Sequence, residues 1–108
     1  PLKIGDSCII RFSQMQIDPE NCDDVFAQVL DFVAGTQPRR LVINMRKVDF
    51  LHSIAIGRLL QTQHAVQRYG GELVFCSLES QARETLAITT IDRFFDIRDS
   101  ERAALTVA

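Results

Sequence analysis

Short, continuously apolar runs alternate along the chain with stretches whose apolar residues recur every three or four positions. The runs occupy residues 8–12 (CIIRF), 41–45 (LVINM) and 73–78 (LVFCSL). Runs of this length and composition are typical of strands covered on both faces, as in a parallel sheet. A further strand is expected at residues 94–97. Residues 2–4 precede the turn signal Gly5-Asp6 and are expected to pair as the first arm of a hairpin.

The intervals between these strands carry the periodicity of amphipathic helices, with recognisable starts and stops. Residues 18–20 (DPE) form a strong start, because a capping carboxylate precedes a proline and an acid in the first turn. Gly35 is predicted to end that helix and Gly70 the next one, since glycine tolerates the left-handed conformation that closes helices. The predicted N-caps of the later helices are Ser53, Ser80 and Asp99.

This alternation of strands and helices predicts an α/β fold with a mixed, mostly parallel sheet. The 108 residues are enough for one compact domain, so residues 1–108 are expected to form a single unit. The helices are amphipathic, and we expect about four of them to pack on one side of the sheet. Arg39-Arg40 and Arg46-Lys47 flank the second apolar run and are predicted to form a solvated basic rim.

Composition excludes several classes of partner. The formal net charge of −2 gives no electrostatic reason to expect nucleic acid or an anionic membrane. No run of about 18 apolar residues is present, so direct membrane insertion is not expected. The cysteines, Cys8, Cys22 and Cys76, are odd in number and lack C-x-x-C spacing, which argues against a disulfide framework or a zinc site. Buried thiols in a reducing compartment are expected, and the chain is predicted to be cytoplasmic.

Catalytic machinery is not visible in the sequence. There is no glycine-rich phosphate loop, Ser-His-Asp arrangement or paired-carboxylate spacing. Asp49 follows a buried strand as a receiver-domain phosphoacceptor would, but the acidic cluster and the lysine that this chemistry needs are missing. His52 and His64 have no metal-ligand spacing with a cysteine or carboxylate. We therefore expect neither an enzyme nor a bound metal or cofactor.

Ser53 stands where the loop after the second apolar run becomes a helix. The free amides of a first helical turn and the helix dipole suit such a point to an anion or a partner. Three interpretations remain open: Ser53 only caps the helix, this edge contacts a partner, or Ser53 is phosphorylated. The last requires a capping hydroxyl, turned inward, to serve as acceptor. His52 is either a polar surface or capping group or a pH-sensitive one.

Residues 48–60 (VDFLHSIAIGRLL) resemble the signature of STAS domains, the sulfate-transporter and anti-sigma-antagonist family. Its usual form is V-x-F-hydrophobic-D-S-S-G-hydrophobic-G, followed by a helix. The resemblance continues through GGELVFCSL, LAITTIDRFFDI and DSERAAL, and covers the chain from Cys8 onward. It implies a bacterial-type regulatory domain with one side of its sheet partly open.

The motif departs from the family pattern at the position that matters for regulation. In regulatory members a kinase phosphorylates the second Ser of Asp-Ser-Ser-Gly, and the matching residue here is Ile54. His52 replaces the Asp and Ala55 the Gly, while Ser53 and Gly57 remain. Because Ile54 has no hydroxyl, the resemblance implies a domain without the usual phosphorylation switch.

The resemblance also implies a partner, such as an anti-sigma factor with a histidine-kinase-like ATPase domain or a related regulator. The residues expected to contact it are His52, Ser53, Ile54, Ile56 and Arg58. Ile54 is expected to be partly exposed, because the matching residue must reach a kinase. The alternative is a scaffold or accessory subunit of a transporter, a lipid-transport assembly or a stress-signalling complex, where the missing serine would carry no penalty.

Overall fold

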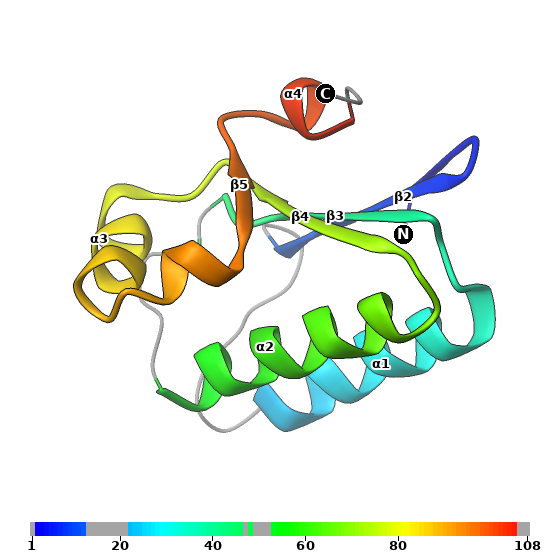
Figure 1. Ribbon diagram of the computed structural model, residues 1–108, viewed down its shortest axis with the longest axis horizontal. Coiled ribbons are helices and arrows are strands. Elements are labelled where there is room, and N and C mark those ends of the chain that lie inside the picture. Colours follow the sequence, from blue (N-terminus) through cyan, green and yellow to red (C-terminus); the bar gives the residue numbers. More distant parts are fainter. Residues whose placement is uncertain (1, 13–21, 47, 49–52, 106–108) are drawn as a thin grey trace.

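Five strands form one mixed sheet in the computed structural model, which describes residues 2–12, 22–46, 48 and 53–105 (Figure 1). The strands are β1 (Leu2–Ile4), β2 (Ser7–Arg11), β3 (Arg40–Asn44), β4 (Glu72–Cys76) and β5 (Asp96–Arg98). They lie in sequence order across the sheet. β1 pairs antiparallel with β2, and the remaining neighbours are parallel. The predicted α/β class and the mixed, mostly parallel sheet are confirmed.

Each central strand begins one residue before the apolar run that predicted it. The first residues of these strands are polar, which is why an apolar pattern omits them: Ser7, Arg40 and Glu72. The run expected at residues 94–97 is divided between two elements. A 3₁₀ helix, η2 (Ile91–Phe94), precedes β5, which starts at Asp96.

The helices cover both faces of the sheet. They are α1 (Cys22–Thr36), α2 (Ser53–Arg68), α3 (Ser80–Ile88) and α4 (Glu101–Leu105). In Figure 1, α1 and α2 lie below the sheet and α4 above it. The expectation that all helices share one side is therefore wrong for α4. Crossovers of one hand place α1, α2 and α3 on the same face, whereas α4 follows the last strand and is not constrained by a crossover.

Alternate residues of the strands feed two apolar layers. Ile10, Ile43 and Phe75 face the larger layer, which lies between the sheet and α1, α2 and α3. Val42 and Val74 face the smaller layer, which Ala104 of α4 covers; the same layer also holds Ile9 and Cys76. Burial on both faces explains why the strands read as continuous apolar runs rather than as an alternation. Two cysteines of the described residues, Cys8 and Cys76, are buried free thiols as expected.

The end of α2 follows the prediction and the end of α1 does not. Gly70 adopts φ +86°, its N–H donates to the Gln67 carbonyl at 3.0 Å, and Gly71 N–H donates to the Val66 carbonyl at 3.0 Å. These two bonds form the glycine-terminated closure of a helix. Gly35, in contrast, lies inside α1. The left-handed residue there is Gln37, with φ 45°, whose N–H donates to the Val33 carbonyl at 2.8 Å.

The N-caps predicted for α3 and α4 are displaced by one residue. The cap of α3 is Glu79 rather than Ser80, and its side chain makes no capping hydrogen bond. At α4, Ser100 Oγ accepts from the Ala103 N–H at 3.1 Å, so Ser100 takes the role predicted for Asp99. A carboxylate and a hydroxyl in adjacent positions are both good caps, and the sequence alone does not choose between them. Residues 18–20, the predicted start of the first helix, lie outside the described residues.

Arg40 is a buried structural residue, so its prediction as part of a solvated rim is wrong. Its side chain spans from the first residue of β3 to α4, where Nη1 donates to the Ala104 carbonyl at 2.7 Å. Nη2 pairs with Glu72 Oε2 at 2.6 Å. Arg39 and Arg46 are exposed, as predicted, and Lys47 lies outside the described residues.

Candidate functional site

Ser53 and Ile54 are the first two residues of α2, and they lie at the end of the sheet that holds the carboxyl ends of the parallel strands. Both side chains are exposed, and Ile54 retains 49% of its accessible surface, which confirms the expected partial exposure. Ser53 is the first residue of the helix rather than the residue before it, so it does not occupy the N-cap position predicted for it. His52, which precedes the helix, lies outside the described residues, as does Asp49.

Ile56 belongs to the core and not to the exposed edge. It retains 8% of its accessible surface, and Ala55 retains 2%. Both lie on the side of α2 that carries Leu59, Thr62 and Val66 into the interior. The apolar character that suggested a partner contact at Ile56 is explained by this burial, so little of its side chain is available to a partner.

Arg58 is engaged within the domain. Its Nε donates to Asp23 Oδ1 at 2.9 Å, its Nη2 lies 2.9 Å from the same oxygen, and its Nη1 donates to Gln61 Oε1 at 3.0 Å. The ion pair joins the start of α1 to the second turn of α2. Both side chains are substantially exposed, so the pair contributes about 0–1 kcal/mol. A partner carboxylate would have to compete with Asp23 for this guanidinium.

A polar cluster that the sequence reasoning missed lies at the ends of β2 and β3. Arg11 Nε and Nη2 donate to the two carboxylate oxygens of Glu101 at 2.8 and 2.9 Å. Asn44 Nδ2 donates to Glu101 Oε2 at 2.6 Å, and the Arg46 N–H donates to Asn44 Oδ1 at 2.9 Å. The cluster therefore joins α4 to the end of the sheet. Its local signal in the sequence was a polar residue in the penultimate position of each apolar run, Arg11 and Asn44.

Electrostatics keep this cluster charged. The hydrogen bonds from Arg11 lower the pKa of Glu101 from 4.5 to about 2, against the opposing effect of burial and with further help from Asn44. Around it lies an open hollow of about 520 Å³, whose lining residues are Arg11, Asn44, Arg46, Ser77, Ser100, Glu101 and Arg102. Glu101 is engaged by Arg11 and Asn44, so it is not poised as a general acid among the described residues that line the hollow.

Neither a metal centre nor a membrane span appears in the described part of the chain. Its His, Cys, Asp and Glu side chains do not gather in groups of three or more that could hold an ion. Among the described helices, none has the length and apolar character needed to cross a membrane.

The sequence profile of the STAS domain matches residues 2–104. The chain belongs to the STAS domain family. The anti-sigma F factor antagonist of Paenibacillus polymyxa is 24% identical over 98 residues, covering 91% of this chain and 83% of that protein.

Solved structures resemble this STAS domain in fold. The protein TM1081 of Thermotoga maritima, determined by NMR, superposes with a TM-score of 0.82 at 18% identity, over 96% of this chain and 82% of that one. An anti-sigma-factor antagonist (STAS) domain protein from Planctomyces limnophilus gives a TM-score of 0.72 at 23% identity, over 82% and 76% of the two chains. At these identities the likeness establishes the shared fold alone.

Proposed function

We propose that this STAS domain is a non-enzymatic interaction module of the anti-sigma factor antagonist type. Its partner is a kinase-type anti-sigma factor or a related regulator, which docks on the edge formed by Ser53 and Ile54. The observation that carries the proposal is the exposure of Ile54 at the start of α2. A branched apolar side chain that remains half exposed beside a helix start is suited to burial by a protein surface.

The proposal includes the loss of the usual switch. In the family pattern, phosphorylation adds close to two negative charges at the position of Ile54 and repels or reshapes the partner surface. Ile54 cannot accept a phosphate, so binding is constitutive. Ser53 is exposed and keeps a hydroxyl, but it precedes the motif's phosphoacceptor position by one residue. The name of the Paenibacillus relative supports the partner class.

The contact is tested by calorimetric titration against a purified anti-sigma factor with a histidine-kinase-like ATPase domain from the same genome. Ile54→Asp should weaken binding by at least about tenfold, because it places a charge in a desolvated contact. Leu60→Asp is the matched control, since Leu60 is an exposed aliphatic residue of the same helix, with 38% of its surface accessible. We expect that variant to bind within about twofold of the unchanged domain.

Incubation with ATP before the titration tests the absence of the switch. An unchanged affinity and an unchanged intact mass are expected. A gain of one phosphate at Ser53 together with loss of binding would contradict the proposed constitutive mode. Equal losses for Ile54→Asp and Leu60→Asp would contradict the proposed edge.

A further inference from the structure

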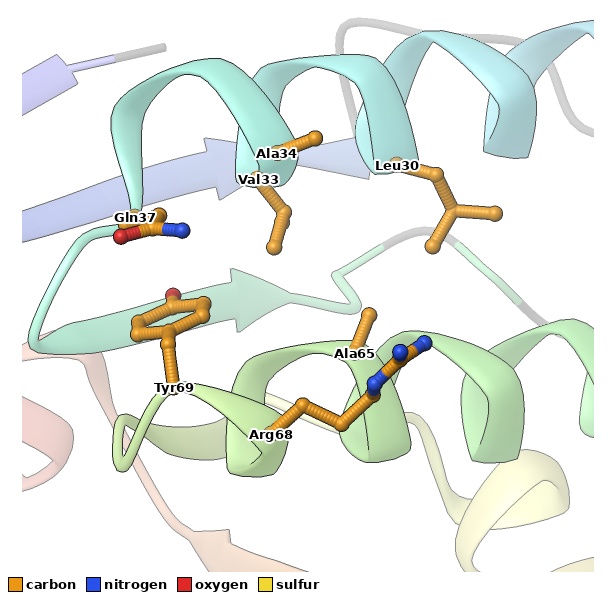
Figure 2. Close-up of a pocket in the computed structure, with 7 residues that line it drawn as sticks. All are labelled: Leu30, Val33, Ala34, Gln37, Ala65, Arg68 and Tyr69. Atoms are coloured by element: carbon orange, nitrogen blue, oxygen red, sulfur yellow. The ribbon is translucent and has the colours of Figure 1, made fainter.

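A groove runs between α1 and α2 on the side of these helices that faces away from the sheet. One hollow of about 310 Å³ lies toward the helix ends, where Leu30 and Val33 point from α1 toward α2 and Ala65 points back (Figure 2). A second hollow of about 200 Å³ lies toward the helix starts, between Phe26 and Gln61. Leu30 lines both hollows, so the two form one groove along the helix pair.

The groove is lined by one stripe of residues from each helix. The α1 stripe is Asp23, Ala27, Leu30 and Ala34, and the α2 stripe is Arg58, Gln61, Ala65 and Arg68. The spacings of three and four residues keep each stripe on one helix face. Alanines at the middle of both stripes leave room for a third backbone to approach closely. The length and shape of the groove therefore fit a helix of about three turns.

The two helices that form the groove have opposite charge. α1 contains three aspartates and no basic residue, whereas α2 contains two arginines and no acidic residue. Arg58 and Asp23 pair across the groove at its start. Asp24 and Asp31 of α1 and Arg68 of α2 are exposed, and none of the three has an ion-pair partner among the described residues.

We propose that this groove binds an amphipathic helix of a partner protein that carries basic residues on the flank facing α1 and acidic residues on the flank facing α2. Its apolar stripe would lie over Leu30, Ala34 and Ala65. Charge complementarity on both walls selects such a helix over a uniformly basic or uniformly acidic one. The groove is a second surface beyond the Ser53–Ile54 edge, so it does not depend on the proposed function.

The probe is a set of three synthetic helical peptides of 16 residues with the same leucine and alanine stripe. The first has lysines on one flank and glutamates on the other; the second has lysines on both flanks, and the third glutamates on both. Titrations followed by fluorescence anisotropy at low salt should give the tightest binding for the first peptide. The two single-sign peptides should bind about two- to fivefold more weakly for each repulsive contact.

Charge reversal on the protein identifies the walls. Asp31→Lys and Arg68→Glu should each weaken binding of the mixed-charge peptide by about two- to fivefold. Gln28→Lys and Gln67→Glu are the controls. Both residues are exposed on the same helices, and neither lies three or four residues from a member of its stripe, whereas Asp31 does so at Ala27 and Ala34. Circular dichroism spectra matching the unchanged domain establish that each variant is folded.

Three results would overturn the proposal. Equal affinity for the three peptides would remove the charge selection. Losses in the Gln28 and Gln67 variants as large as those in the Asp31 and Arg68 variants would move binding elsewhere. Sedimentation velocity showing a dimer that Arg68→Glu dissociates would assign the groove to a second copy of the chain. Loss of anti-sigma factor binding on Ile54→Asp, with peptide binding intact, would separate this groove from the proposed function.

Discussion

Arg11 and Glu101 lie 90 residues apart in the sequence, yet their side chains form a two-pronged ion pair with N–O distances of 2.8 and 2.9 Å. The pair fixes the start of α4 against the end of β2. Asn44 binds the same carboxylate from the neighbouring strand. Because α4 is only five residues long, such contacts matter more for its position than its own helical hydrogen bonds do.

Replacing Glu101 by glutamine tests this attachment. Glu101→Gln keeps the shape but removes the charge that Arg11 recognises. We expect the free energy of unfolding at pH 7 to fall by about 1–2 kcal/mol, allowing for screening by solvent at this partly exposed site. Urea denaturation measures the change. Glu84→Gln, at an exposed position of α3, is the control and should shift stability by less than about 0.5 kcal/mol. Equal effects of the two variants would contradict a special role for Glu101.

The same pair predicts a pH dependence. The pKa of Glu101 is lowered from 4.5 to about 2, so its contribution is complete above its ordinary pKa and is lost as pH falls through about 2. The stability difference between the unchanged domain and Glu101→Gln should therefore shrink steadily between about pH 5 and pH 2. Thermal unfolding of both proteins at a series of pH values measures this difference. A gap that stays constant with pH would show that the carboxylate charge is not its cause.

Arg40 predicts a contrast with its neighbour in the sequence. Arg40→Ala would leave the Ala104 carbonyl without its donor in a buried setting and should cost about 1–3 kcal/mol of unfolding free energy. Arg39→Ala changes an exposed side chain and should alter stability by less than about 0.5 kcal/mol. Both are measured by chemical denaturation. If the two losses were alike, the attachment of α4 by Arg40 would have to be abandoned.

Replacement by alanine should change the stability of the domain in opposite directions at Gly57, inside α2, and at Gly70, just after its end. Gly57 lies within the helix, is exposed, and has open space where a Cβ would stand, so Gly57→Ala should stabilise the domain by about 0.5–1 kcal/mol. Gly70 has φ +86°, so Gly70→Ala should destabilise it by about 1 kcal/mol. Differential scanning calorimetry gives both shifts. The same sign for both changes would refute the conformational explanation.

The sequence predicted those features that depend on neighbouring residues. Continuous apolar runs located the three central strands, because both faces of each strand are covered. The end of α2 at Gly70 was predicted because a helix commonly closes with a residue in the left-handed conformation, which glycine adopts readily. Ile54 was expected to be partly exposed from the family motif, and it is.

The features that were missed depend on residues distant in the sequence. The pairing of Arg11 with Glu101 and the burial of Arg40 arise where α4 meets the sheet, and nothing in the local pattern fixes the face that α4 covers. The resemblance to the family motif placed Ile56 at the partner edge, and its burial depends on which face of α2 packs against the sheet. The acidic residues of α1 and the basic residues of α2 border the same groove because the two helices lie side by side in the fold.

The outer strands limit how another protein can attach to this domain. β1 and β5 are each three residues long, and β5 carries a side-chain pair between Arg98 and Asp96 at 2.7 Å. Short, charged borders of this kind discourage the addition of a foreign strand to the sheet. Recognition is thereby directed to helical surfaces, where side chains rather than backbone amides decide which protein is accepted.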